Sequence, residues 1–414
     1  MNKRRVVISG MGLVSPLGHS PEAFWANLLA GKSGIGPITR FDVSPYYARI
    51  AGEIRDFDPE DYIERKDARR MDPFTHFGLA AARMAMMDSR LDLDAIDRER
   101  IGVLVGSGIG GLHVMQEQGR NFEREGPKKF SPFMIPQMIT DILSGYIAIE
   151  YGLQGPNFSI SSACATAAHS MGESMRMIQY GDADIMVAGG AESALNDLGI
   201  GGFDKMRALS RKRNDDPEAA SRPFDAERDG FVMAEGAGVL VLEEMGHAKA
   251  RGARIYCELA GYGRTCDAYH ITAPHETGRG AARAMSLAME DAGLQPEQVQ
   301  YINAHGTSTP LNDRGETMAI KTAFGEEQAY KLAISSTKSM TGHALGAAAA
   351  FESVACALTL RDQIVPPTIN YEHPDPDCDL DIVPNQKREM TVEACLNNSL
   401  GFGGHNACLC FRKI

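Results

Sequence analysis

The chain has 414 residues, more than one hydrophobic core usually supports, so we expect two core units. Its formal charge of −12, with no long acidic or basic run, disfavours nucleic-acid binding. No apolar run approaches the roughly 18 residues that cross a membrane. The short apolar stretch after the basic N-terminus is too short for a signal peptide. The eight cysteines form no CxxC pair, which indicates buried thiols in a reducing compartment, and we predict a cytoplasmic protein.

The first predicted elements are short buried strands that end in glycines. KRRVVISGMG opens the chain, and ERIGVLVGSGIGG follows a helical stretch near residue 100. The second segment satisfies G-x-G-x-x-G at Gly106, Gly108 and Gly111, but the acidic residue expected about 20 positions later is not convincingly placed. We therefore interpret these glycines as a substrate-side loop and not as a nicotinamide site. Residues 110–155 and 193–235 are predicted insertions that hold substrate loops or partner contacts.

A candidate nucleophile follows near residue 160, where the chain reads ISSACATAAHSMG. The pattern predicts a strand, a small-residue turn and a buried helix, with Cys164 at the start of that helix. A helix N-terminus favours the thiolate, so we predict a pKa for Cys164 below the usual value of about 8.5. By position alone the cysteine has an equally good structural interpretation. His169 lies inside the helix, and we predict a structural role for it.

The second part of the chain repeats the first. ISSTKSMTGHALG aligns with ISSACATAAHSMG at one constant spacing, which puts Ile160 on Ile334, Cys164 on Lys338 and His169 on His343. EQVQYINAHGTST corresponds to ERIGVLVGSGIGG, CLNNSLGFGGHN to DIMVAGGAES, and KARGARIYCELAGYG to the N-terminal strand. We predict two α/β halves, residues 1–252 and 253–414, which are related by a pseudo-twofold axis and have layered helices over parallel or mixed sheets.

Three loops are expected to converge at the carboxyl ends of the strands. They carry Cys164, His305, and the segment from Lys338 to His343. A lone histidine in a glycine loop is often a hydrogen-bonded core residue, but two beside a cysteine indicate covalent catalysis. The N–H group of Phe402, in GFGGHN, is placed to join that of Cys164 in an oxyanion site. No zinc-type ligand spacing appears in the sequence, so we predict neither a metal nor a cofactor.

Four stretches, SSACATAAH, NAHGTSTPLND, STKSMTGHALGAA and GFGGHN, resemble the signature stretches of the elongating β-ketoacyl-acyl-carrier-protein synthases, type II more than type I. The resemblance covers essentially the whole chain. It implies a thiolase-like fold and decarboxylative condensation of an acyl-enzyme thioester with malonyl-acyl carrier protein. Cys164 would be the nucleophile, His305 and His343 would hold the malonyl thioester and stabilise its enolate, and Lys338 would support them. The N–H groups of Cys164 and Phe402 would form the oxyanion hole, and Phe402 would also act as a gate.

The resemblance also implies the residues that bind substrate and carrier. Thr307 and Thr309 match pantetheine contacts, and Ile109 and Phe203 match positions that line the acyl tunnel. Leu400 stands where many relatives carry a second phenylalanine, which leaves chain-length preference and gate behaviour open. The family docks an acidic carrier protein on basic residues. At the matching positions this chain, which is acidic overall, has Lys66, Arg69, Arg70 and Arg207. A homodimer is expected by the same resemblance.

Other functions share parts of this pattern. A thiolase-like acyltransferase that uses coenzyme A normally has a second cysteine as base, and GFGGHN offers none at the matching loop. A polyketide ketosynthase carries the same motifs and is poorly separated by sequence. A non-catalytic partner that measures chain length typically lacks the nucleophile, so the presence of Cys164, His305 and His343 argues against it.

Overall fold

The computed structural model describes residues 3–414. Nine strands form one mixed sheet in the order β4-β5-β6-β1-β7-β13-β12-β8-β9. The neighbours β4–β5, β12–β8 and β8–β9 are parallel and the others are antiparallel. The mixed sheet confirms the predicted α/β class. The strands are β1 Val6–Val14, β4 Ile101–Gly106, β5 Ile185–Glu192, β6 Gly236–Glu244, β7 Cys257–Cys266, β8 Tyr301–Asn303, β9 Ala333–Ser335, β12 Ala394–Gly401 and β13 His405–Arg412; short pairs are formed by β2 Gly36–Pro37 with β3 Ile50–Ala51 and by β10 Ile364–Val365 with β11 Arg388–Glu389.

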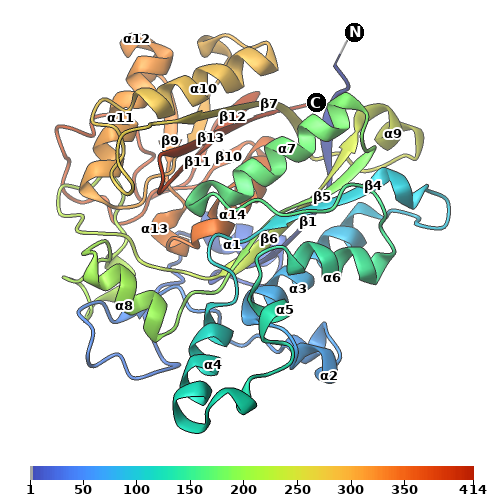
Figure 1. The fold of residues 1–414 in the computed structure, drawn as a ribbon. Coiled ribbons are helices and arrows are strands. Elements are labelled where there is room, and N and C mark those ends of the chain that lie inside the picture. The colour runs from blue at the N-terminus through green and yellow to red at the C-terminus, as the bar shows by residue number, and fades with distance from the viewer. Residues whose placement is uncertain (1–2) are drawn as a thin grey trace.

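Helices cover both faces of the sheet (Figure 1). No helix within residues 3–414 is long and apolar enough to cross a membrane. The α-helices are α1 Pro21–Leu29, α2 Arg65–Ala68, α3 Pro73–Ser89, α4 Leu112–Glu125, α5 Met134–Met138, α6 Ile142–Tyr151, α7 Thr166–Tyr180, α8 Asp197–Lys205, α9 Met245–Ala250, α10 Arg279–Ala292, α11 Pro310–Phe324, α12 Glu326–Ala329, α13 Lys338–Thr341 and α14 Ala348–Asp362. Two one-turn 3-10 helices near the site are η4 Ala163–Ala165 and η7 Leu345–Ala347.

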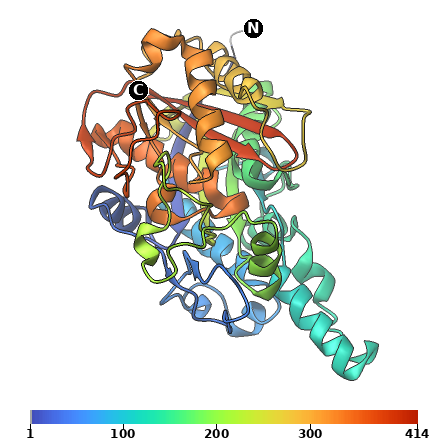
Figure 2. The ribbon, with the colours of Figure 1, turned by 90° about the vertical axis from the view of Figure 1, so that its left-hand side faces the viewer.

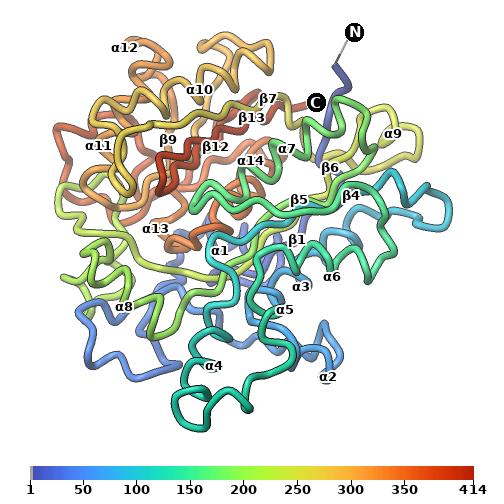
Figure 3. Tube along the Cα trace, viewed as in Figure 1, coloured from blue at the N-terminus to red at the C-terminus, as the bar shows by residue number. Residues whose placement is uncertain are grey.

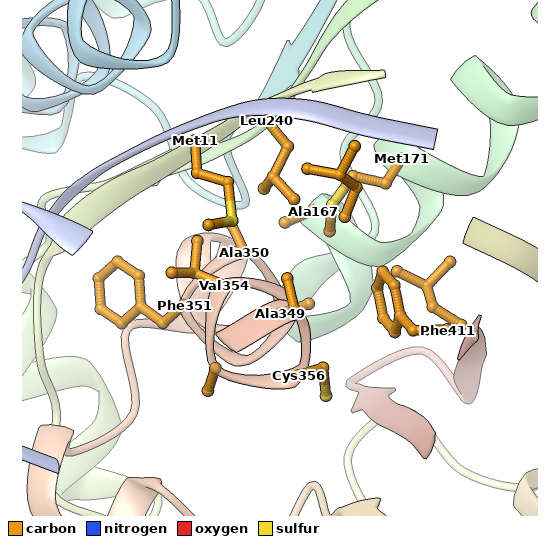
Figure 4. Close-up of a cluster of buried hydrophobic side chains, with 14 of the residues drawn as sticks. Met11, Ala167, Met171, Leu240, Ala349, Ala350, Phe351, Val354, Cys356 and Phe411 are labelled. Atoms are coloured by element: carbon orange, nitrogen blue, oxygen red, sulfur yellow. The ribbon is translucent and has the colours of Figure 1, made fainter. Parts of the chain in front are cut away.

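Three hydrophobic clusters define the layers. In the middle layer, α7 and α14 pack between strands through side chains such as Met171, Phe351 and Phe411 (Figure 4). A second cluster lies between α3, α6 and the strands β4, β5 and β6, and a third lies between α10, α11 and the strands β8, β12 and β13. Each group of strands is therefore buried between two helical layers, as a fully covered α/β sheet requires.

The strand order is the same on the two sides of the β1–β7 pair when β6 is matched with β13, β5 with β12 and β4 with β8; β9 has no counterpart among the described strands. Early strands and late strands gather on two sides of the central helices in Figure 3. A Cβ atom on Gly12 of β1 would lie 1.9 Å from the carbonyl oxygen of Ala81 on α3, and one on Gly263 of β7 would lie 1.9 Å from that of Ala284 on α10. Both glycines permit the same close strand–helix approach. This symmetry supports the predicted duplication, and the boundary between residues 252 and 253 stays a prediction.

The predicted alignment of the repeat is wrong in its helical part. The 15-residue helices α7 and α14 each follow a one-turn 3-10 helix, η4 and η7. The first residues of these turns, Ala163 and Leu345, both adopt positive φ, 50° and 47°. Cys164 therefore corresponds to Gly346 and not to Lys338. The second copy holds the extra turn α13 between β9 and η7, which the identical ISS strings do not reveal.

Candidate active site

One cavity of about 600 Å³ collects most of the predicted site residues, and its size is typical of a small-molecule site. Cys164, His305, His343 and Phe402 all line it. So do the predicted tunnel, pantetheine and gate positions, together with one of the predicted carrier contacts: Ile109, Phe203, Thr307, Thr309, Leu400 and Arg207.

Cys164 lies in η4, two residues before α7 begins. Its side chain is buried, and Nε2 of His343 lies 3.1 Å from its Sγ atom. The main-chain N–H groups of Phe402 and of Cys164 itself both lower the pKa of the thiol. The end of β12 comes this close because residue 401 is glycine; a Cβ atom there would lie 2.8 Å from the carbonyl oxygen of Ser162. Both members of the predicted donor pair therefore lie beside the thiol, and their role as an oxyanion hole stays a prediction.

The predicted acidity of this thiol is wrong. Burial raises the pKa of Cys164 to about 12, and the positive charge of Lys338 offsets only part of that effect. The sulfur is buried and lies in a 3-10 turn that precedes the helix, so burial outweighs the partial charge of the helix end. Cys164 is consequently a neutral thiol at rest. Its proton needs a base, and Nε2 of His343 is in hydrogen-bond contact with the sulfur.

His305 follows β8, and its backbone is fixed by a buried carboxylate. The N–H groups of His305 and Gly306 donate to the two oxygens of Glu316 on α11, each at 2.8 Å. Burial, followed by the charge of Lys338 and the neighbouring His343, holds the pKa of His305 well below its usual value. The imidazole is therefore neutral near pH 7.

His343 follows α13 and is held by the last residues of the second predicted insertion. Its N–H donates to the carbonyl oxygen of Val232 at 2.7 Å, and its own carbonyl accepts from the N–H of Ala234 at 2.9 Å. Burial and then the charge of Lys338 keep its pKa well below the usual value. The two imidazole rings of His305 and His343 lie edge to face, with centroids 5.3 Å apart. Two neutral imidazoles thus face the same sulfur.

Lys338 lies behind the histidines and does not line the cavity. Its ammonium is fully buried and pairs with Glu352 of α14. Burial raises the pKa of Glu352 to about 7, while Lys338 opposes that shift. Lys338 therefore influences the site by its charge and not by contact with the cavity.

Sequence reasoning missed three residues that shape the site. Phe231 packs edge to face on His343, with ring centroids 5.3 Å apart, and also packs on Phe203. Glu192, at the end of β5, accepts from Ser107 and from the N–H groups of Gly108, Ile109 and Gly346, and burial raises its pKa to about 7. Glu316 is the third. An acidic residue on the buried face of a predicted helix is a usable signal for Glu316, whereas nothing in the sequence around Phe231 indicates its place.

The predicted carrier contacts do not form one group within this chain. Lys66, Arg69 and Arg70 are exposed on α2 and just after it, and the guanidinium of Arg70 lies 4.7 Å from the ring centroid of Phe133. Arg207 lies after α8 at the cavity, and Figure 1 shows α2 and α8 well apart.

The structure also reveals a ligand set that sequence spacing did not indicate. Side-chain ligand atoms of Cys164, His305 and His343 all lie within 4.8 Å of one another. The three residues belong to separate loops, so no local spacing motif precedes them.

Comparisons with known proteins agree along the whole chain. Residues 3–248 match the beta-ketoacyl synthase N-terminal domain, and residues 256–372 match the C-terminal domain. The 3-oxoacyl-[acyl-carrier-protein] synthase 2 of Synechocystis sp. is 52% identical over 413 residues, covering 100% of this chain and 99% of the relative. The protein of the same name from Staphylococcus aureus (strain COL) is 51% identical over 411 residues, covering 99% of both.

Solved structures agree with this assignment. A type II PKS acyl-carrier protein in complex with its ketosynthase bound to the hexaketide gives a TM-score of 0.92 at 39% identity, and the ishigamide ketosynthase/chain length factor gives 0.93 at 37%. Both matches cover 100% of this chain and of the matched chain, and they confirm the predicted fold. The chain therefore belongs to the beta-ketoacyl synthase family and, with it, to the acyl-transferring enzymes.

Proposed function

We propose that this chain joins an acyl group held on Cys164 to malonyl-acyl carrier protein, with loss of CO₂, and so elongates fatty acids by two carbons. The observation that carries the proposal is the convergence of a thiol, two neutral imidazoles and two main-chain N–H donors at one cavity. Covalent capture fixes one reactant beside the other, which makes the second step nearly intramolecular.

The first step is acyl transfer to sulfur. Nε2 of His343 accepts the Cys164 proton as the sulfur attacks the acyl thioester, because the buried thiol does not ionise by itself. The N–H groups of Cys164 and Phe402 stabilise the oxyanion of the tetrahedral intermediate. The carrier thiolate then leaves and takes the proton, so the acyl-enzyme forms with His343 neutral again.

The second step uses the imidazoles as donors, so His343, which carries its proton on Nδ1 when Nε2 accepts in the first step, must carry it on Nε2 in the second. Each neutral ring offers one N–H, and His305 and His343 together bind the malonyl thioester oxygen on which enolate charge develops when the C–C bond to the carboxylate breaks. The enolate carbon attacks the acyl carbonyl, and the Cys164 sulfur leaves. One proton is taken up overall to restore the thiol, and CO₂ is released.

Two other functions have less support. A polyketide-type ketosynthase is supported by the solved ketosynthases at 39% and 37% identity, but the 3-oxoacyl-[acyl-carrier-protein] synthase 2 relatives are more similar, at 52% and 51%. A non-catalytic chain-length partner does not need a base in contact with a cysteine, which is present here.

The test is intact-protein mass spectrometry after mixing with an acyl-carrier thioester. We expect one acyl adduct on Cys164 that malonyl carrier protein discharges as a product two carbons longer. Cys164→Ala should form no adduct and no product, while Cys266→Ala, which removes the exposed thiol, should behave like the wild type. An adduct that persists in Cys164→Ala would refute the mechanism, and no adduct with any chain length would favour the partner function.

We also propose carrier-protein contacts, a location and an oligomeric state for this enzyme. Arg207 at the cavity, and the group Lys66, Arg69 and Arg70 on the acidic background, are the proposed docking contacts for an acidic carrier. A cytoplasmic location is supported by eight free cysteines. A homodimer is supported by an exposed sheet edge with apolar side chains around it.

A further inference from the structure

The candidate active site has the composition of a metal site as well as that of a condensing enzyme. One thiol and two imidazoles are the ligand types that Zn²⁺ and similar thiophilic ions prefer, and three protein ligands leave the fourth tetrahedral position open. The ligand atoms of Cys164, His305 and His343 lie within 4.8 Å of one another, and all three side chains are at least nine-tenths buried.

The distances suit coordination after a small adjustment. With bonds of about 2.3 Å to sulfur and about 2.0 Å to nitrogen, the sulfur and nitrogen ligands of a tetrahedral ion lie roughly 3.5 Å apart. Sγ of Cys164 and Nε2 of His343 are 3.1 Å apart, so they must separate by roughly half an ångström. No side chain holds the ring nitrogens of His305, and its Nδ1 atom is buried without a hydrogen-bond partner among residues 3–414.

We propose that Cys164, His305 and His343 form a three-ligand site for a thiophilic divalent ion such as Zn²⁺, and that occupancy of this site inhibits the enzyme. Coordination replaces the Cys164 S–H bond with a sulfur–metal bond and releases one proton to solvent, without any redox change. The bound ion removes the nucleophile and both enolate donors at once. The inhibition is reversible because a chelator restores all three groups.

The surrounding charges make this site weaker than a structural zinc site. The buried ammonium of Lys338 repels a second cation, although its partner Glu352 neutralises much of that charge. Glu192 also lines the cavity, but its oxygens accept hydrogen bonds from four donors and are not free to bind metal. The site therefore responds to a rise in free metal and does not need permanent occupancy.

Cobalt binding to the full chain tests the site without any turnover, so its outcome is independent of the condensation reaction. The wild type should bind one Co²⁺ per chain with a sulfur-to-cobalt charge-transfer band and the visible bands of a tetrahedral ion. Cys164→Ser should lose the charge-transfer band, and His305→Gln should bind at least tenfold more weakly. Cys266→Ser is the matched control, because Cys266 is the exposed thiol, and it should bind like the wild type. A band that survives in Cys164→Ser, or unchanged affinity in His305→Gln, would overturn the proposal.

A second measurement uses only the wild type and therefore does not depend on whether a variant folds. Buffered free Zn²⁺ should slow iodoacetamide alkylation of Cys164 at least tenfold, as read by peptide mass, and chelation should restore the rate. Cys266 in the same sample is the internal control, and its alkylation should not change. Equal alkylation of Cys164 with and without zinc would rule out the site.

Discussion

At the scale of single residues, the site consists of buried groups whose pKa values are influenced by the positive charge of Lys338. Burial lowers the pKa of His305 and of His343 and raises that of Cys164, whereas the charge of Lys338 lowers all three. For the imidazoles the charge adds to the effect of burial, and for the thiol it opposes it. The charge of Lys338 therefore keeps the histidines neutral and keeps the pKa of the thiol low enough for a base to take its proton.

Replacing Lys338 should move the pH dependence of both steps. In Lys338→Met the pKa of the imidazoles rises, so they become protonated at higher pH, and the acid limb of malonyl decarboxylation should shift to higher pH. The pKa of the thiol also rises, and one unit corresponds to about tenfold less thiolate, so iodoacetamide should alkylate Cys164 about tenfold more slowly. Decarboxylation rates and alkylation rates across pH measure both effects.

Lys249→Met is the control, because Lys249 is an exposed lysine on α9, outside the cavity and outside the proposed carrier contacts. It removes the same charge and should leave both profiles unchanged. An acid limb in Lys338→Met that stays in place, or shifts to lower pH, would contradict the electrostatic role of Lys338.

At the scale of elements, one buried carboxylate joins two helices beside the cavity. Asp72 is the N-cap of α3 and accepts from the N–H of Phe74, and its second oxygen accepts from the N–H of Val114 on α4. Burial raises its pKa from the usual 3.8 to about 7. Between these values the folded protein holds a proton that the unfolded chain has lost, so stability falls as pH rises from about 4 to about 7.

Asp72→Ser keeps a capping hydroxyl and removes the titration. At pH 5, where Asp72 is protonated in the folded protein, it should cost about 1 kcal/mol, because the N–H of Val114 loses its acceptor. Between pH 5 and pH 8, however, its unfolding free energy should fall by about 2 kcal/mol less than that of the wild type. Urea unfolding at both pH values measures this difference. Equal losses in the two proteins would show that Asp72 is already ionised at pH 5 in the folded state.

Elements also show where sequence reasoning ends. The strands β1, β4, β5 and β12 are predictable because short apolar runs end in glycines that the chain uses for close approach and tight turns. The position of η7 is not predictable, because α13 is inserted after β9 without disturbing the ISS string. The convergence of Cys164, His305 and His343 is predictable, because all three lie on loops at the ends of strands. The raised pKa of Cys164 is not predictable, since burial depends on side chains such as Phe231 that no spacing rule identifies.

At the scale of the whole molecule, the sheet has one end that the described chain leaves open. β4 is the last strand on that side, and beyond it residues 155–157 add two backbone hydrogen bonds, to Ile101 and Val103, and an isolated bridge between Val103 and Asn157. The segment that follows is partly exposed, and Phe158 is 41% exposed. The neighbouring α4 and α5 extend from the body in Figure 2, and exposed apolar side chains at α5 and on α6 include Phe133, Ile135 and Ile149. An open edge with exposed apolar side chains is typical of an interface.

A twofold pairing of this edge would extend the sheet across two chains and would bury the same apolar side chains from both copies. We expect two chains of 44.8 kDa to sediment as one species at micromolar concentration. Because each copy contributes one residue 158, Phe158→Asp places two buried charges in such an interface. If each charge costs roughly 2 kcal/mol, the dissociation constant should rise about a thousandfold. Met87→Asp is the control, since Met87 is 78% exposed on α3 and away from the open edge, and it should sediment like the wild type. A wild type that sediments as a single chain would rule out the dimer. A Phe158→Asp variant that stays paired would place the dimer contact elsewhere, because a charge in the apolar surface of this edge has to weaken any pairing there.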